Sequence, residues 1–101
     1  MDVELLHFDG CPSWQSALEE LRAALAELAI QAEVRLVRVE TDEQAQTTRF
    51  VGSPTIRVNG ADLFPVGHTQ YALGCRVYAT PGGLRGWPDR AMIAAALREI
   101  R

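Results

Sequence analysis

The feature that most constrains this chain is a cysteine at the point where an apolar strand pattern passes into a helical pattern. Residues 3–8 form a mostly apolar run, residues 9–10 predict a tight turn, and Cys11 and Pro12 lead into a helical pattern that begins at Trp14. A short apolar run before a turn is typical of a buried strand, and proline suits the first position of a helix. We therefore expect Cys11 at the junction of a central strand and a helix N-terminus.

A thiol in this position is expected to be reactive. It faces unpaired backbone N–H groups and the positive end of the helix dipole, so we expect the pKa of Cys11 to lie below the free-cysteine value of about 8.5. An ionised Asp9 beside it would oppose this effect by like charge. The alternative is that Cys11 is a buried, unreactive apolar residue. Its place between Gly10 and Pro12 favours a functional thiol.

Length and charge narrow the functional classes. The chain has 101 residues, of which 48% are hydrophobic and 23% charged, so we expect one globular domain over residues 1–101. The net charge of −3 offers no basic surface for phosphates, and we expect no nucleic-acid partner. The sequence sets no oligomeric state.

The N-terminus and the cysteine count predict a cellular location. No apolar run approaches about 20 residues, and residues 1–4 are acidic where a signal peptide would be basic, so we expect no membrane partner and a cytoplasmic location. Cys11 and Cys75 are the two cysteines of the chain. Two are too few for a disulfide-stapled scaffold, and a reducing compartment would keep them as thiols unless they work in redox chemistry.

The first half of the chain predicts a β-α-β unit followed by a second helix. Apolar residues at helical spacing predict a helix over residues 14–30, and β-branched residues predict a strand over 32–39 that is parallel to the first strand. Residues 41–44 read Thr-Asp-Glu-Gln and match a capping box, which predicts a helix that runs to about Phe50.

The second half predicts a hairpin, a long irregular segment and a final helix. Asn59-Gly60 lies between two strand-like runs, residues 55–58 and 61–64, and is the strongest short-range signal for a two-residue hairpin. Residues 65–87 are rich in Gly and Pro, with a short extended piece over 75–78. The final helix opens at Pro88-Asp89. Its expected buried stripe comprises Met92, Ile93, Ala96, Leu97 and Ile100. Arg98 and Arg101 are expected near the C-terminal end of the helix, where its dipole favours positive charge.

The predicted order β-α-β-α-β-β-α, with a cysteine between the first strand and helix and a Ser-Pro pair before the third strand, resembles the thioredoxin/glutaredoxin superfamily. The resemblance implies a four-stranded mixed sheet flanked by helices, a nucleophilic Cys11 and a cis bond between Ser53 and Pro54. It also implies that substrate backbones dock beside Pro54. The implied substrate-binding residues are Gly10, Pro12, Trp14, Ser53 and Pro54.

More narrowly, residues 8–12 (Phe-Asp-Gly-Cys-Pro) together with residues 75–78 (Cys-Arg-Val-Tyr) resemble a group of small thioredoxin-like proteins, some of them labelled alkylmercury lyase. The chain departs from the dithiol members because Trp14 stands where their Cys-x-x-Cys motif has its second cysteine. Trp14 begins the apolar stripe of the helix, and we expect it to pack against the core. The site is then either a monothiol or a dithiol whose second cysteine comes from elsewhere.

The position of the fourth strand decides whether Cys75 can be that second cysteine. If residues 61–64 form the strand, the following segment leaves the sheet at the edge where Cys11 lies, and Cys75 can return to it. If residues 75–78 form the strand, Cys75 begins at the opposite edge. A disulfide requires Cα atoms within about 7 Å. The Asn59-Gly60 turn favours the first layout, so we expect Cys75 to resolve adducts on Cys11.

Three functions are consistent with these residues. We favour a thiol–disulfide oxidoreductase that uses Cys11 and Cys75, requires no cofactor and reacts with a protein or small-molecule thiol or disulfide. The second is a binding protein that holds mercury, copper or zinc through the two thiolates and His68. The third is an interaction domain without chemistry, in which Cys11 is unreactive.

Overall fold

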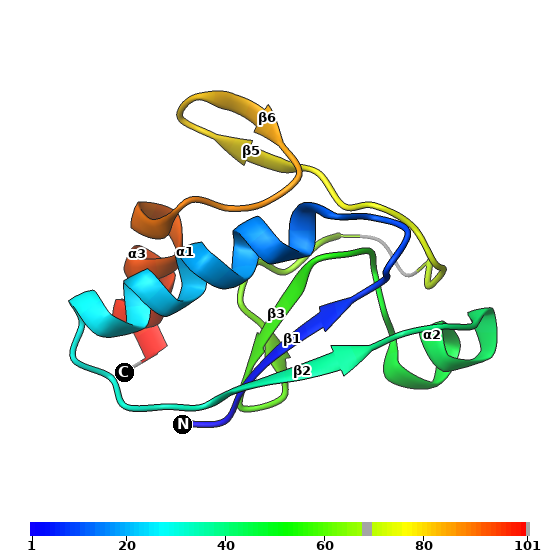
Figure 1. Ribbon diagram of the computed structural model, residues 1–101, viewed down its shortest axis with the longest axis horizontal. Helices are drawn as coiled ribbons and strands as arrows, with labels where there is room; N and C mark the ends of the chain where they lie inside the picture. Colours follow the sequence, from blue (N-terminus) through cyan, green and yellow to red (C-terminus); the bar gives the residue numbers. More distant parts are fainter. Residues whose placement is uncertain (68–69, 101) are drawn as a thin grey trace.

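The computed structural model describes residues 1–67 and 70–100, and a four-stranded mixed sheet lies at its centre (Figure 1). β1 pairs in parallel with β2 and antiparallel with β3, which in turn pairs antiparallel with β4. The spatial order is therefore β2-β1-β3-β4, as the first of the two predicted layouts requires. The four strands are β1 (Val3–His7), β2 (Val34–Arg38), β3 (Thr55–Val58) and β4 (Ala61–Asp62).

The hairpin between β3 and β4 follows from its turn residues. Asn59 and Gly60 have φ values of 53° and 85°, the left-handed conformation that a two-residue turn of this kind needs and that Asn and Gly tolerate best. The predicted hairpin is confirmed, although β4 is shorter than the expected run over residues 61–64.

Three helices accompany the sheet within the described ranges: α1 (Ser13–Glu27), α2 (Asp42–Thr48) and α3 (Arg90–Ile100). Helix α1 ends earlier than the predicted residue 30, and Ala29 has a left-handed φ of 55°. None of the helices in this part of the chain has the length and apolar character that spanning a membrane requires.

Side chains cap the starts of α2 and α3. The predicted capping box is present: the Thr41 hydroxyl accepts from the Gln44 N–H at 3.1 Å, and the Gln44 side chain accepts from the Thr41 N–H at 3.3 Å. At α3, the Asp89 carboxylate accepts from the Met92 N–H at 2.8 Å.

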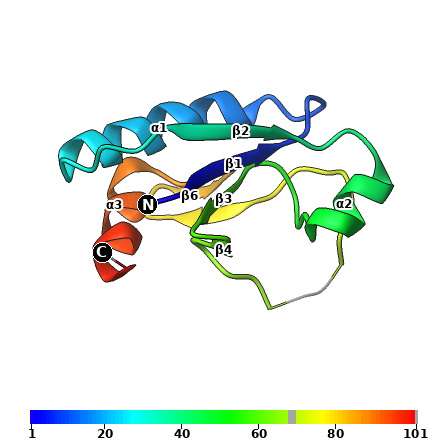
Figure 2. The same cartoon turned by 90° about the horizontal axis from the view of Figure 1, so that it is seen from below.

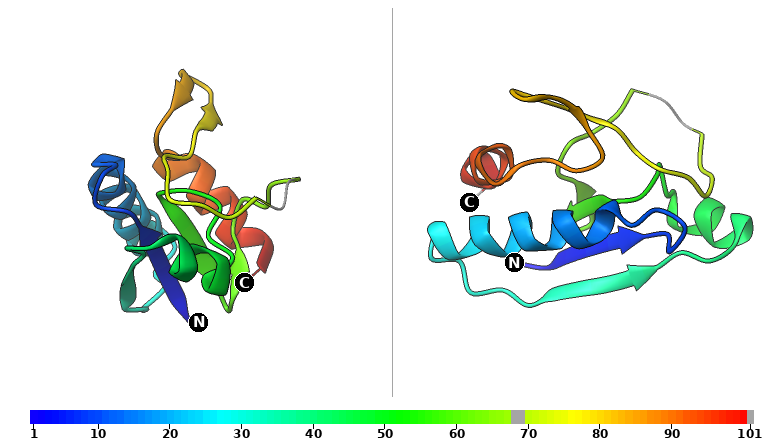
Figure 3. Two further views of the ribbon diagram at one scale, coloured as in Figure 1. Left: turned by 90° about the vertical axis from the view of Figure 1, so that its right-hand side faces the viewer. Right: turned by 45° about the horizontal axis from the view of Figure 1, so that its top comes forward.

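Helices α1 and α3 pack together against one face of the sheet and enclose the larger core cluster (Figure 3). Because side chains alternate along β1, Leu5 faces this cluster and Leu6 faces the other side, where it packs with Phe50. Helix α2 lies beyond the C-terminal ends of β1 and β2 (Figure 2). The buried members of the larger cluster are Val3, Leu5, Ala17, Leu21, Ala24, Leu25, Ile56, Val58, Ile93, Ala94 and Leu97.

The predicted buried stripe of α3 is confirmed only at Ile93 and Leu97. Ala94 is the third buried residue, Met92 and Ala96 are half-buried, and Ile100 is 50% exposed, so the prediction is wrong at these positions. Arg101 lies outside the described residues.

A second, two-stranded sheet occupies part of the segment that was predicted to be irregular. It consists of β5 (Tyr78–Thr80) and β6 (Gly83–Arg85), and it projects from the body of the protein (Figures 1 and 3). The turn between the two strands is Pro81-Gly82, a pair typical of turns. The segment before it, residues 74–76, does not join β4 but lies against the start of β3.

Candidate functional site

Cys11 lies where the sequence pattern predicts, between β1 and α1. Its backbone N–H donates to the Phe8 carbonyl at 3.0 Å, which closes a turn, and Pro12 then forms the N-cap of α1. The helix therefore begins at Ser13, directly after Pro12, so the proline caps the helix and is not its first residue. Cys11 is buried, with 2% of its surface exposed, whereas Pro12 is exposed beside it.

Gly10 is favoured at this turn by the position of the Phe8 ring. Its φ is not in the left-handed region. A Cβ atom at Gly10 would instead lie 2.6 Å from two carbons of the Phe8 ring, a distance at which the ring would have to move. Phe8 packs against the smaller core cluster, so the glycine allows the turn to close over this ring.

The second cysteine is brought to the site by a short β-bridge. Ser53 and Cys75 are paired in parallel, with the Ser53 N–H donating to the Gly74 carbonyl and the Arg76 N–H donating to the Ser53 carbonyl, both at 2.8 Å. These two hydrogen bonds flank Cys75 and fix its backbone alongside the start of β3. We call residues 74–76 the docked segment.

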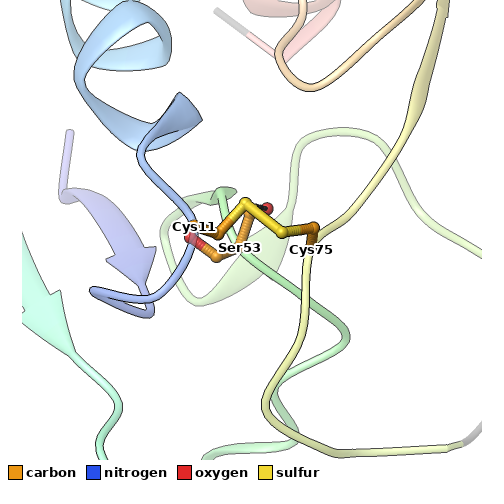
Figure 4. The surroundings of a disulfide bond; sticks show 3 residues. All are labelled: Cys11, Ser53 and Cys75. Carbon is orange, nitrogen blue, oxygen red and sulfur yellow. Dashed lines mark hydrogen bonds between the residues drawn. A yellow bond between two sulfur atoms is a disulfide. The ribbon is translucent and has the colours of Figure 1, made fainter.

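Cys11 and Cys75 form a disulfide across this junction, as the favoured layout predicts (Figure 4). The two residues are 64 positions apart in sequence, and their Cα atoms are 5.7 Å apart, within the range normal for disulfides. Ser53 lies beside both cysteines, and its carbonyl oxygen is 3.7 Å from the Cys11 sulfur. Because both cysteines are oxidised, the lowered thiol pKa of Cys11 stays a prediction.

Gly52 allows the docked segment to approach β3 closely. It has a φ of +125°, and a Cβ atom there would lie 3.0 Å from the Cβ of Arg76. Both the backbone conformation and the space therefore favour glycine at this position. No local sequence pattern indicates this requirement, because it arises from a contact with a residue far along the chain.

Arg76 anchors the docked segment by a buried network that the sequence analysis also missed. Its guanidinium donates to the Thr55 hydroxyl at 3.2 Å, to the Asp62 carboxylate at 2.8 Å and to the Phe64 carbonyl. It also lies 4.6 Å from the centre of the Tyr78 ring. We call these four contacts the Arg76 anchor. They tie the residue after Cys75 to β3, to β4 and to the segment that follows β4.

Tyr78 adds a further tie. Its hydroxyl donates to the Pro54 carbonyl at 2.5 Å. Burial raises the pKa of the Tyr78 hydroxyl, so the group keeps its proton at neutral pH and remains a donor. This hydrogen bond holds the start of β5 against the residue immediately before β3.

The predicted substrate-binding residues Ser53 and Pro54 are covered by the chain itself. The Ser53–Pro54 peptide bond is cis, and both residues are buried under the docked segment and Tyr78. The Ser53 hydroxyl is buried and has no hydrogen-bond partner within the described residues. A substrate backbone could therefore reach Pro54 only after the docked segment moved away.

Trp14, the third predicted substrate contact, packs instead. It lies against the larger core cluster and stacks on His7, with ring centroids 4.2 Å apart. The expectation that it is a packing residue is confirmed.

The Nδ1 atom of His7 is 3.2 Å from the Asp9 carboxylate but not in hydrogen-bonding geometry, and Arg38 is 3.2 Å from the other Asp9 oxygen.

The charge state of His7 is set mainly by its burial. Desolvation lowers the pKa of His7, and the nearby Arg38 lowers it further, whereas Asp9 raises it less than these effects lower it. His7 is therefore neutral at pH 7. By stacking on Trp14, the neutral His7 ring links the end of β1 to the first turn of α1.

Within the described ranges, no group of three or more His, Cys, Asp or Glu side chains could hold a metal ion. His68, the third ligand in the predicted metal-binding alternative, lies outside the described residues.

Comparison of the chain with known protein families finds no matching family model, and no curated protein or solved structure matches it. The chemistry of the site is therefore inferred from its own residues.

The Arg76 anchor generates a prediction about stability. Arg76→Met should lower the free energy of unfolding by roughly 2–4 kcal/mol, because it leaves the half-buried Asp62 carboxylate and the Phe64 carbonyl without their donor. The matched control is Arg38→Met, which removes a 58% exposed arginine from an ion pair and should cost less than about 1 kcal/mol. Urea unfolding of the fully reduced proteins measures both without a contribution from the disulfide. Equal losses in the two variants would contradict the anchoring role.

The pKa of His7 generates a prediction about pH. Because the folded-state pKa lies below the unfolded value of about 6.5, the unfolded chain takes up a proton first as the pH falls. The contribution of His7 to the free energy of unfolding is therefore constant above about pH 6.5 and falls as the pH drops below it. The free energy of unfolding should fall more between pH 7.5 and pH 5.5 in the wild type than in His7→Gln. If the free energy of unfolding depends on pH identically in both proteins, the pKa of His7 is the same in the folded and unfolded states, which would contradict the prediction.

Proposed function

We propose that this protein is a thioredoxin-like thiol–disulfide oxidoreductase whose redox centre is the Cys11–Cys75 pair. The observation that carries the proposal is that each cysteine is held in place by contacts other than the disulfide. Cys11 follows a hydrogen-bonded turn into α1, and Cys75 lies between two backbone hydrogen bonds to Ser53. Two thiols fixed in this way stay close after reduction, and the disulfide can re-form within the molecule.

The order of elements supports the thioredoxin-like part of the proposal. The main sheet and its helices follow the order β-α-β-α-β-β-α, with β5 and β6 as an additional hairpin before α3. The cysteine at the β1–α1 junction and the cis Ser53–Pro54 bond before β3 occupy the positions that the resemblance implies.

The proposed reaction is a two-electron exchange. A substrate with two thiols would be oxidised to its disulfide while the Cys11–Cys75 disulfide is reduced to two thiols, and the reverse reaction would reduce a substrate disulfide. Each direction passes through a mixed disulfide between the protein and the substrate. The N-terminus of α1 favours the thiolate form of Cys11. The exchange needs no cofactor, because the substrate supplies or accepts both electrons.

The test is redox cycling of the folded protein in glutathione buffers. The fraction of oxidised protein should follow a single reversible two-electron transition, measured by mass spectrometry as the loss of two hydrogens. The folded protein should also accelerate the reduction of a disulfide-bonded model peptide by dithiothreitol. Cys11→Ser and Cys75→Ser should each abolish this acceleration, because the internal disulfide needs both cysteines.

A disulfide that is reduced only after the protein is unfolded in denaturant would contradict the proposal. The pair would then be a structural crosslink, and the protein would belong to the class of interaction domains without chemistry. Binding of Zn²⁺ or Hg²⁺ by the reduced protein, without any acceleration of peptide reduction, would favour the metal-binding alternative.

A further inference from the structure

We propose that Cys75, rather than Cys11, is the sulfur that exchanges with substrates, and that Cys11 is the internal resolving thiol. This inference rests on the proposed redox function and reverses the roles that the sequence analysis assigned. The two residues differ sharply in accessibility: Cys11 is 2% exposed, whereas Cys75 is exposed. A disulfide is attacked at the sulfur that an incoming thiolate can reach, so access decides the order of events.

The surroundings of the disulfide give an approach route to Cys75. A surface hollow of about 340 Å³ is lined by the docked segment and by Val51, Leu73 and Val77, and Cys75 is among its described lining residues whereas Cys11 is not. Cys11 is covered by the turn before α1, by Ser53 and by Cys75 itself (Figure 4). An external sulfur therefore meets Cys75 first.

The reductive step can be written for this geometry. A substrate thiolate attacks the Cys75 sulfur from the hollow and forms a substrate–Cys75 disulfide. The bond between the Cys75 and Cys11 sulfurs breaks, and its electron pair leaves on Cys11 as a thiolate. A second substrate thiolate then attacks the substrate sulfur, which releases the substrate disulfide and leaves Cys75 as a thiolate.

The reverse reaction uses the same atoms in the opposite order. The Cys75 thiolate attacks a substrate disulfide and releases one substrate thiolate. The Cys11 thiolate then attacks the Cys75 sulfur of the mixed disulfide, which releases the second substrate thiolate and restores the internal disulfide. Cys11 needs to reach only Cys75 in this sequence, and its burial is therefore no obstacle.

The helix start suits Cys11 to the role of internal leaving group. A thiol with a lower pKa leaves faster, and Cys11 precedes the N-terminus of α1.

The experiment traps the first intermediate on the wild-type protein. The oxidised protein is mixed with reduced glutathione, quenched with acid at the earliest measurable times and alkylated with N-ethylmaleimide, and the adducts are located by peptide mass spectrometry. We expect glutathione on Cys75 and N-ethylmaleimide on Cys11 to exceed the reverse arrangement by at least about tenfold. Glutathione found equally or mainly on Cys11 would overturn the assignment while leaving the redox function intact.

Single-cysteine variants give an independent measurement. The reduced Cys11→Ser variant, which retains Cys75, should form a mixed disulfide with oxidised glutathione at least about tenfold faster than reduced Cys75→Ser, which retains Cys11. In denaturant the two rates should become similar, which shows that the fold causes the difference. A faster reaction of the Cys75→Ser variant in the folded state would overturn the inference. If glutathione adds to neither cysteine of the folded wild type, the redox function itself fails, and this assignment fails with it.

Discussion

Arg76 carries a positive charge but is only 6% exposed. Neighbouring protein groups must therefore supply the hydrogen bonds that water would otherwise make to its guanidinium. The Asp62 carboxylate, the Thr55 hydroxyl and the Phe64 carbonyl accept its N–H groups, and the Tyr78 ring lies against its planar face. An arginine left here without these partners would be costly, so the docked position is strongly preferred. Because Arg76 follows Cys75 directly, the same contacts determine where the second sulfur lies.

The contacts of Arg76 bear on whether the disulfide acts as a structural crosslink. Bringing together two residues 64 positions apart costs conformational entropy, and a disulfide that did this alone would act mainly as a crosslink. Here the Arg76 anchor, the Ser53 bridge and the space at Gly52 already place Cys75 beside the β1–α1 junction. Reduction of the disulfide would then leave Cys75 beside Cys11, which is what the proposed redox function requires. The two residues of the pair also differ in exposure, since Cys75 is exposed and Cys11 is buried.

The parts of the fold that the sequence predicted are those with local signals. The turn and proline around Cys11, the capping box at Thr41 and the Asn59-Gly60 hairpin each depend on residues within a few positions of one another, and all three are present. The hairpin also predicted that the chain leaves β4 at the edge of the sheet where Cys11 lies, so that Cys75 could reach Cys11. Local patterns thus predicted the helices and the hairpin, and only together with the sheet that the family resemblance implied did they predict the pairing of the cysteines.

The rest of the site depends on contacts between distant residues, which no local pattern contains. Arg76 finds acceptors 14 and 21 positions earlier in the chain, and Gly52 is required by the approach of Arg76. Position at a helix start indicates reactivity but not exposure, so the sequence did not show that Cys11 is buried and Cys75 is exposed. Only the Pro81-Gly82 turn between β5 and β6 had a local signal that could have been used.

The central claim is that the docked segment stays against β3 when the disulfide is absent. Amide hydrogen exchange of Arg76 in the fully reduced protein tests this most directly, because its N–H donates to the Ser53 carbonyl at 2.8 Å in the docked position. The account predicts that this amide remains protected after reduction, at a level comparable with that of the oxidised protein. Exchange at the rate of an unprotected amide once the disulfide is reduced would show that the covalent bond alone holds the segment, and would contradict the account.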